Sequence, residues 1–427
     1  MRSATLTLLL ALAGCDFYEE AALDSAPEAV PYGDCDPTIL IPTGVLADAP
    51  SIPADPHADT FGAGATPYAV RYQWPGRDPS TSAAFLWRTD VDTLASVIEI
   101  GPTEGWPDDA VRVEGASFLF GSGEVGDGLY RIHEARLCDS LTPGTPYTYR
   151  VGGDGHWSTA YSFTTPGAPG TFDTFRVAIS GDSRGAYETW GQLLSAMDSH
   201  APDFFLFSGD MVEFGSTQSE WDAWFEASGD IFARKAFVAA HGNHEFLAQH
   251  YFAQFAFPGN EEWFAIDYGD LLLLSLNDTV RDQEQIESEQ VLYMERELSG
   301  TAARWKVAMH HQPVYSTCTR HGSHESLRDA WTPVWDTWNV DLVLAGHNHI
   351  YERSVPIRGG REIEGGTLYL VSGGAGAPLY EESEADWFGA VADPVVHYIV
   401  ADFGPEGVDL VVRNLDGDVL DSFSVPR

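Results

Sequence analysis

Side chains that bind metal ions follow five strand-length apolar runs in the C-terminal part of this 427-residue chain. Each group contains aspartate, asparagine or histidine, and carboxylate, amide and imidazole groups are ligands for Zn, Mn and Fe in proteins. Glycine precedes most of these residues, which lets the backbone turn sharply and direct a side chain toward a metal ion. The candidate ligands are Asp182, Asp210, Asn243, His310, His347 and His349.

This set of residue types suits the hydrolysis of a phosphate ester by two metal ions. A single aspartate can bridge two ions through its two carboxylate oxygens. Two ions about 3.5–4 Å apart can bind one hydroxide between them and lower the pKa of the water from which it forms. They also neutralise the charge that develops during in-line attack on phosphorus. We therefore predict a binuclear site for Fe, Zn or Mn and a substrate that carries a phosphate ester.

The segments around these ligands predict a layered α/β domain from residue 172 to 427. Near-continuous apolar strands that alternate with amphipathic helices are typical of buried sheets. Loops that follow such strands meet at one edge of the sheet, where ligands bind in open α/β folds. A C-terminal hairpin, 408–412 and 419–425, is expected to close the same domain. The expected strands cover 175–180, 204–207, 236–240, 271–276, 305–309, 342–345 and 367–371, and the expected helices cover 188–200, 219–230, 287–298 and 327–338.

The preceding segment, 61–166, has a different pattern. Short alternating stretches are separated by turns rich in Gly, Pro and Asp, which favours an all-β sandwich. Its closing stretch, 141–151, resembles a fibronectin type III domain, with Tyr147 as the tyrosine-corner residue. Residues 15–60 are rich in Ala, Pro and Asp and are interpreted as a tether.

The N-terminus indicates export. Arg2 is followed by a short apolar run that ends in Leu12-Ala13-Gly14-Cys15. The run is too short to span a bilayer and predicts a signal peptide over residues 1–14. The tetrapeptide resembles a bacterial lipobox, which implies that Cys15 becomes the lipidated first residue and that the protein is anchored by lipid alone in the periplasm or at the cell surface. The alternative is an ordinary signal peptide with a cysteine nearby.

Export would place the chain in an oxidising compartment. Under those conditions Cys35 and Cys138 form a plausible disulfide that ties the tether to the first domain. The formal net charge of −41 would repel nucleic-acid backbones and anionic lipid headgroups. We therefore expect no nucleic-acid binding and no membrane contact other than the lipid anchor.

The ordered motifs, from Asp182 through Gly242-Asn243-His244-Glu245 to Gly346-His347-Asn348-His349, resemble a calcineurin-like metallophosphoesterase. The following Tyr351-Glu352-Arg353 and the fibronectin-like domain in front are similar to the purple acid phosphatase branch. The resemblance implies a two-sheet β-sandwich flanked by helices and the hydrolysis of phosphate monoesters. It also implies that Asp182, Asp210 and His349 hold the first metal and that Asp210 bridges to a second one held by Asn243, His310 and His347.

Four further residues are candidates for contact with substrate. The resemblance implies that His244 touches the phosphate or the leaving oxygen. Arg184 follows a ligand by two residues, and a guanidinium can grip two phosphate oxygens at once; the alternative is a turn residue bonded to a local carboxylate. His311 and His321 are expected to shape the leaving-group pocket.

One position departs from the purple acid phosphatases, which carry an iron-ligating tyrosine three residues after the bridging aspartate. Here that position is Glu213. The colour of a tyrosinate–iron(III) pair is therefore not expected. Glu213 is either a fourth ligand to the first metal or a solvated loop carboxylate.

Two other functions remain open from the sequence. A phosphodiesterase or nucleotide hydrolase would use the same metals, because the shape of the pocket loops decides between esters. A surface binding protein with a decayed phosphoesterase domain is of another class, and decay would remove ligands first. All six ligand positions are filled, which favours the enzyme.

Overall fold

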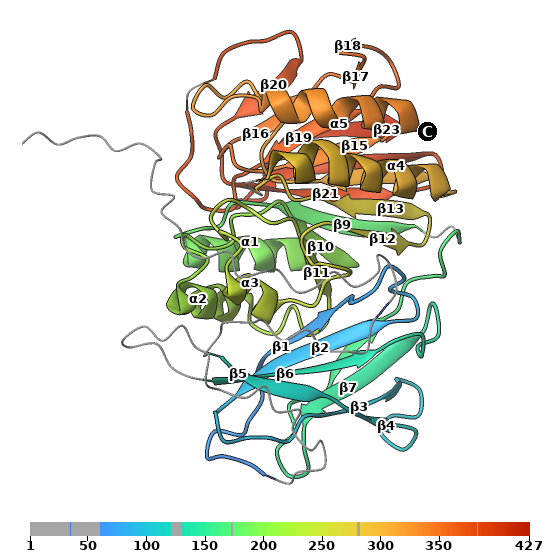
Figure 1. Cartoon of the computed structure of the whole chain (residues 1–427), viewed down its shortest axis with the longest axis vertical. Helices are drawn as coiled ribbons and strands as arrows, with labels where there is room; N and C mark the ends of the chain where they lie inside the picture. Colours follow the sequence, from blue (N-terminus) through green and yellow to red (C-terminus); the bar gives the residue numbers. More distant parts are fainter. Residues whose placement is uncertain (1–34, 36–59, 121–129, 172–173, 280–281, 382) are drawn as a thin grey trace, which may run out of the picture.

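The computed structural model describes residues 35, 60–120, 130–171, 174–279, 282–381 and 383–427 (Figure 1). The expected signal peptide, Cys15 and almost all of the expected tether lie outside these residues. Within the described residues, every helix is too short or too polar to cross a bilayer.

The N-terminal part is a β-sandwich, as predicted. Its strands are β1 Tyr68–Gln73, β2 Ala83–Thr89, β3 Val97–Pro102, β4 Val111–Glu114, β5 Ala116–Phe120, β6 Tyr130–Leu137, β7 Pro146–Gly152 and β8 Tyr161–Thr164. They form two four-stranded antiparallel sheets with the orders β1-β2-β6-β5 and β4-β3-β7-β8. Buried aromatic side chains such as Phe85 and Tyr149 fill the space between the sheets.

Two expected features of this sandwich are present. At the start of β7, the Tyr147 hydroxyl accepts a hydrogen bond from the backbone N–H of Thr142 at 3.0 Å, which is the tyrosine-corner arrangement. Cys35 and Cys138 form a disulfide bond. The prediction that these two cysteines pair is confirmed.

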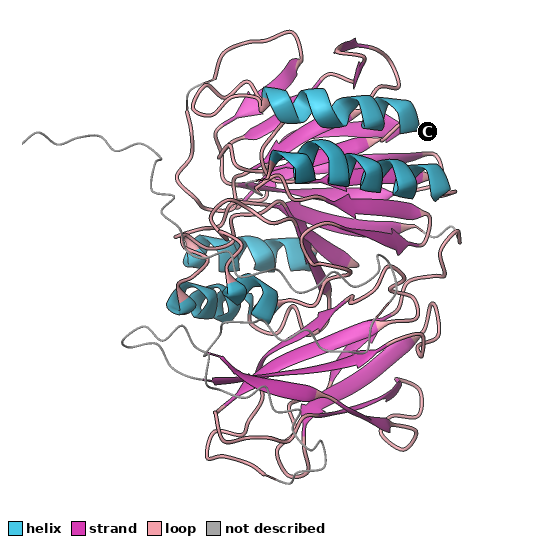
Figure 2. Ribbon diagram, in the orientation of Figure 1, coloured by secondary structure: helices cyan, strands magenta, loops and turns pink. Residues whose placement is uncertain are grey.

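The C-terminal part consists of two packed sheets with helices outside them, which confirms the predicted fold class (Figure 2). The six-stranded sheet contains β9 Phe175–Ser180, β10 Phe204–Phe207, β11 Ala236–Ala239, β21 His397–Phe403, β22 Gly407–Asn414 and β23 Val419–Pro426. The seven-stranded sheet contains β12 Phe264–Tyr268, β13 Leu271–Ser275, β14 Trp305–Met309, β15 Leu342–Ala345, β16 Tyr351–Ser354, β19 Leu368–Ser372 and β20 Gly389–Asp393. A small hairpin, β17 Ile357–Arg358 and β18 Arg361–Glu362, extends from the second sheet.

Helices cover the outer faces of both sheets (Figure 1). Helices α1 Tyr187–Ser199 and α2 Gln218–Ser228 pack on the six-stranded sheet, and α3 Gln249–Gln254 lies close by. Two helices pack on the seven-stranded sheet, α4 Gln290–Gly300 and α5 Glu325–Trp338. A π-helical turn, Gln285–Glu289, precedes α4. The side chains of Trp331 and Trp335 in α5 are buried.

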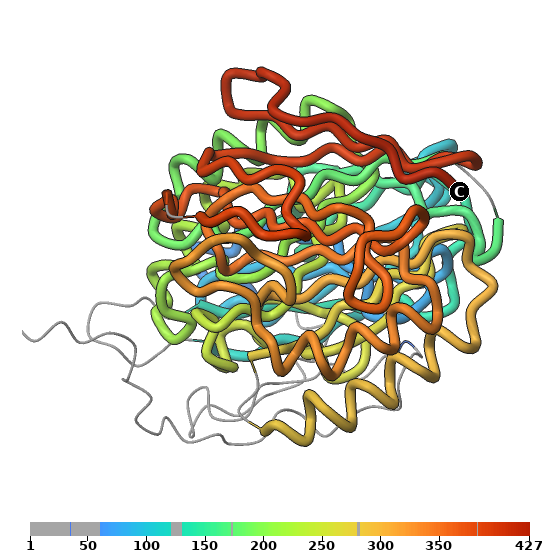
Figure 3. The backbone as a smooth tube through the Cα atoms, turned by 90° about the horizontal axis from the view of Figure 1, so that it is seen from above, coloured from blue at the N-terminus to red at the C-terminus, as the bar shows by residue number. Residues whose placement is uncertain are grey.

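The strand order explains why the site residues meet. Strands β11, β10 and β9 run parallel in one sheet, and β13, β14, β15 and β19 run parallel in the other. The ends of these strands therefore lie at one edge of the double layer. The C-terminal hairpin β22–β23 belongs to this domain, as predicted; it joins the six-stranded sheet through β21 and lies at its outer edge (Figure 3). Strands β12, β16, β20 and β21, the small hairpin β17–β18 and the short α3 were not predicted from the sequence.

The two parts share an extensive interface. The Tyr149 hydroxyl donates to the Ala233 carbonyl at 2.6 Å, and the buried Arg88 pairs with Asp222 of α2 at 2.6 Å. One continuous apolar cluster includes side chains from both parts. The sandwich therefore supports the helical side of the six-stranded sheet.

Candidate metal centre

The loops after five strands supply the candidate ligands. The backbone at Asp182, Asp210 and His347 is left-handed, with φ of 63°, 57° and 64°. Such values are uncommon for residues other than glycine and cluster at functional sites. The glycine before each residue leaves room for the turn: a Cβ at Gly209 would lie 2.6 Å from the His311 ring. Three turns with left-handed backbone therefore direct three side chains toward one point.

Two groups of ligand atoms lie together at this edge, and they share Asp210. One group is Asp182, Asp210 and His349, and the other is Asp210, His311 and His347. In each group the ligand atoms lie within 4.8 Å of one another. The Asn243 side-chain oxygen joins the second group, 3.0 Å from His311 Nε2 and 2.9 Å from His347 Nδ1. Two adjacent groups with one shared carboxylate fit two metal ions.

The position of His310 corrects the predicted ligand set. Its Nδ1 lies 2.8 Å from Asp278 Oδ2, and its ring packs beside Trp331 and Trp335 of α5. His311 occupies the place expected for His310. Successive side chains at the end of a strand point to opposite faces, so only one of two adjacent histidines can face the site, and the sequence does not say which.

The electrostatics of the cluster suit cations. Asp182 and Asp210 are fully buried, and burial raises the pKa of Asp182 well above its usual value. Burial disfavours the cationic form of His311, but Asp210 outweighs this effect and raises the pKa of His311 to about 10. Two buried carboxylates this close require positive charge beside them. Carboxylate, imidazole and amide oxygen atoms in this arrangement fit a pair of Zn, Mn or Fe ions.

The two other histidines are in the form that binds metal. Burial lowers the pKa of His347 well below its usual value and lowers that of His349 to about 3. Both imidazoles are therefore neutral over the physiological range and offer a lone pair. The His349 Nδ1 lies 2.7 Å from the Pro378 carbonyl oxygen, which directs Nε2 toward Asp182 at 3.6 Å.

Buried carboxylates behind the ligands hold the loops in place. Glu245 accepts hydrogen bonds from the backbone N–H groups of Asp210, Met211 and Gly242 at 2.8–2.9 Å. Asp278 accepts from the N–H groups of the residues that follow β14, including His311 at 3.2 Å. Sequence reasoning included Glu245 in a motif without a role and missed Asp278, which no motif marks.

His244, Arg184 and Glu213 lie together on one side of the ligands. His244 donates its backbone N–H to Asp210 Oδ1 at 2.9 Å, and its ring Nδ1 lies 2.6 Å from the Glu213 carbonyl oxygen. Glu213 binds the Arg184 guanidinium at 2.6 Å. Among the described residues, Glu213 belongs to neither of the two ligand groups. The Glu213 side chain is 35% exposed and is therefore a partly solvated loop carboxylate. Its pairing with Arg184 is the alternative expected for Arg184, a turn residue bonded to a local carboxylate.

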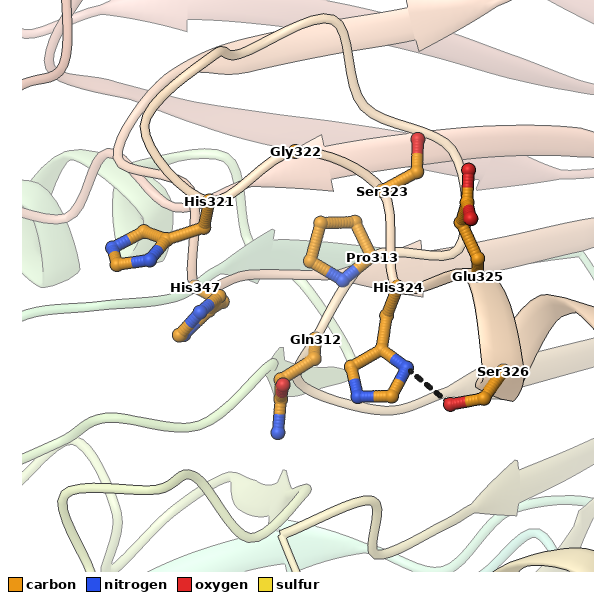
Figure 4. A pocket seen from close by; sticks show the side chains of 9 residues that line it. All are labelled: Gln312, Pro313, His321, Gly322, Ser323, His324, Glu325, Ser326 and His347. Carbon is orange, nitrogen blue, oxygen red and sulfur yellow. Dashed lines mark hydrogen bonds between the residues drawn. The ribbon is translucent and has the colours of Figure 1, made fainter. Parts of the chain in front are cut away.

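A pocket of about 340 Å³ lies beside the ligands (Figure 4). His347 and His321 are among the residues that line it, and their ring centroids are 4.5 Å apart. The remaining lining comes from the loop after β14 and the start of α5, including Gln312, His324 and Glu325. His321 therefore lines a pocket next to the ligand His347, whereas His311 lies among the ligands.

Tyr380 is a site residue that the sequence analysis missed. Its ring stacks on His349 with centroids 4.2 Å apart, and the Arg320 guanidinium carbon lies 4.9 Å from the centroid of the Tyr380 ring. Its backbone N–H donates to the His349 carbonyl at 3.0 Å. Tyr380 follows no predicted strand directly, so no positional signal in the sequence pointed to it.

Comparison with known proteins agrees with this site. Residues 175–351 match the calcineurin-like phosphoesterase family, and residues 67–165 match the purple acid phosphatase N-terminal domain. Purple acid phosphatase 22 of Arabidopsis thaliana is 27% identical over 307 residues, which cover 67% of this chain and 68% of that protein. Acid phosphatase type 7 of Homo sapiens is 27% identical over 357 residues, covering 73% and 78%.

A solved structure shares the fold over most of its length. The purple acid phosphatase PPD1 from yellow lupin (Lupinus luteus) seeds has a TM-score of 0.74 at 23% identity, and the match covers 85% of this chain and 74% of that one. The family match shows that the chain contains a calcineurin-like phosphoesterase domain, and the shared-carboxylate geometry agrees with it. Within that class, its N-terminal domain and its relatives are those of purple acid phosphatases, which use a binuclear metal centre.

Proposed function

We propose that this protein hydrolyses phosphate monoesters at a binuclear metal centre. The observation that carries the proposal is the pair of ligand groups that share Asp210. The acid phosphatase relatives support a monoester as the substrate. We propose that Asp182, Asp210 and His349 hold one ion and that Asp210, Asn243, His311 and His347 hold the other.

Bound cations would polarise the phosphate and lower the pKa of a water molecule between them. The protein's own groups orient the reaction. The Glu213 carbonyl accepts from His244 Nδ1, which fixes the hydrogen on that nitrogen. Nε2 is then the atom of His244 that can exchange a proton with the leaving oxygen. His321, which lines the pocket beside His347, is placed to contact the alcohol part of the ester.

The proposal is tested by metal analysis of the purified protein together with hydrolysis of 4-nitrophenyl phosphate. We expect about two metal ions per chain and metal-dependent turnover. Asp210→Asn should lose at least one ion and nearly all turnover, because a neutral amide bridges two cations poorly. Asp267→Asn is a control, since Asp267 pairs with Arg77 away from the site. Full activity of the Asp210 variant would reject the site assignment.

The same assay separates the alternatives. Faster hydrolysis of bis(4-nitrophenyl) phosphate than of the monoester would identify a phosphodiesterase that uses the same ligands. A chain that binds no metal, hydrolyses neither ester and cannot be reconstituted would be a binding protein with a decayed site.

We further propose that the protein is exported and anchored through lipid on Cys15. The disulfide between Cys35 and Cys138 supports export, because such bonds persist in oxidising compartments. Wild-type protein should partition into the detergent phase of a Triton X-114 extract and incorporate labelled fatty acid, whereas Cys15→Ala should do neither. Partition of both proteins into the aqueous phase would contradict the anchor.

A further inference from the structure

Two carboxylates hold Arg184 beside the metal ligands and leave one of its donors without a hydrogen bond in the described part of the chain. Its Nε lies 3.7 Å from Asp210 Oδ2, and its Nη1 binds Glu213 at 2.6 Å. The side chain is 15% exposed, and Nε is buried without a hydrogen-bond partner among the described residues. One N–H of a largely buried guanidinium therefore has no hydrogen-bond acceptor among the residues described at the site. Burying such a donor costs free energy unless a ligand accepts its hydrogen bond.

Charge balance leads to the same conclusion, and this step depends on the proposed binuclear function. The two ligand groups would hold two cations, and Asp210, as a ligand shared by both, would then compensate the charge of Arg184 less. Glu213 would remain as the carboxylate partner of the guanidinium. Such a site favours a multiply charged oxyanion, and a guanidinium fits two oxygens of a tetrahedral phosphate.

Tyr380 completes the same corner. Its ring stacks on His349, and its hydroxyl group interacts with the Arg184 side chain. The hydroxyl is thus oriented by stacking rather than by a flexible loop. A phenol beside a guanidinium supplies a second donor for an oxyanion.

We propose that Arg184 and Tyr380 form a phosphate-binding pair on the side of Asp182 and His349, with Glu213 as the residue that orients the guanidinium. Glu213 therefore anchors the phosphate-binding arginine. This role accounts for a carboxylate at the position where the purple acid phosphatases have a metal-ligating tyrosine.

The test uses the metal-loaded full-length protein and inorganic phosphate as the probe. Phosphate affinity is measured by calorimetry and by competitive inhibition of ester hydrolysis, and metal content is measured in the same samples. Arg184→Met should weaken phosphate binding on the order of 10- to 100-fold, the effect of losing a charge-assisted contact, with metal content unchanged. Arg184→Lys should recover part of the loss, because an ammonium keeps the charge but not the two-pronged geometry.

Two further variants separate contact from orientation. Tyr380→Phe keeps the stack on His349 and should weaken phosphate binding without loss of metal. Its effect should be less than additive with that of Arg184→Met, because both donors act on one ligand. Glu213→Gln should raise KM more than it lowers kcat, since it loosens the guanidinium and removes no group that touches the substrate.

Arg176→Met is the matched control, because it removes the same charge at the other end of β9, where Arg176 pairs with Asp402. Unchanged phosphate affinity in Arg184→Met, or a fall in its metal content, would overturn the proposal. The outcome is separable from that of the proposed function. A wild-type protein that binds phosphate through Arg184 but hydrolyses no ester would refute the function alone, and active protein with unaltered phosphate affinity in the variant would refute the pair alone.

Discussion

The buried carboxylate of Glu245 gives the sharpest prediction about how the fold positions the metal site. Glu245 Oε2 accepts from the backbone N–H groups of Asp210 and Gly242 at 2.9 and 2.8 Å, and Oε1 accepts from Met211 at 2.8 Å. The side chain is completely buried. It therefore ties the loop that carries the bridging aspartate to the loop that carries Asn243.

The substitution Glu245→Gln keeps the shape and removes the charge. The amide oxygen can replace Oε2 and keep two hydrogen bonds, but the amide nitrogen then faces the N–H of Met211. One charge-assisted hydrogen bond is lost and one buried N–H is left unpaired, so we expect unfolding to become easier by about 2–4 kcal/mol. At roughly 2–4 °C per kcal/mol, Tm should fall by roughly 5–15 °C. Because Asp210 is less firmly oriented, metal affinity should fall about 10- to 100-fold.

Thermal unfolding by circular dichroism gives the stability, and competition with a chelator gives the metal affinity. Glu297→Gln is the control: this carboxylate is also buried, but it binds the side chains of Arg77 and Arg296 and lies away from the ligands. The control should lose stability and keep its metal affinity. If Glu245→Gln shows the expected fall in Tm with wild-type metal affinity, the orientation argument is refuted and Glu245 serves stability alone.

Three other outcomes follow from the structure. Cys138→Ser removes the disulfide that closes a loop with a sequence separation of 103 residues, so it should destabilise the protein by about 2–4 kcal/mol. Chemical denaturation measures this loss, and an unchanged midpoint would contradict it. Burial raises the pKa of Glu262 to about 7 from 4.5, so Glu262 keeps its proton to a higher pH in the native protein than in the unfolded chain. The free energy of unfolding should therefore decline by about 3 kcal/mol as pH rises from 4.5 through 7. Glu262→Gln should flatten this pH dependence when unfolding is measured by denaturant titration. Iron-loaded protein should show no strong visible absorption, because Glu213 replaces the tyrosine ligand of purple acid phosphatases, and a purple preparation with an intense band would show that another phenolate binds iron.

Much of the architecture follows from local pattern. The strands β9, β10, β14 and β15 begin and end where their apolar runs do, because a strand buried on both faces needs an unbroken run. The ligand types also follow from the sequence, since metal chemistry restricts them to a few side chains. Strands β16 and β20 were missed because each is short and pairs with neighbours that are distant in sequence, whereas β12 was missed although it forms a local hairpin with β13.

The tertiary structure alone decided which of these side chains meet. His310 and His311 are the same residue type at adjacent positions, and only the packing of β14 against α5 turns the first toward Trp331 and the second toward Asp210. The pairing of Arg184 with Glu213 joins two loops that no local rule connects. Side-chain direction at a strand end depends on which face its neighbours leave open, and that information exists only once both sheets are packed.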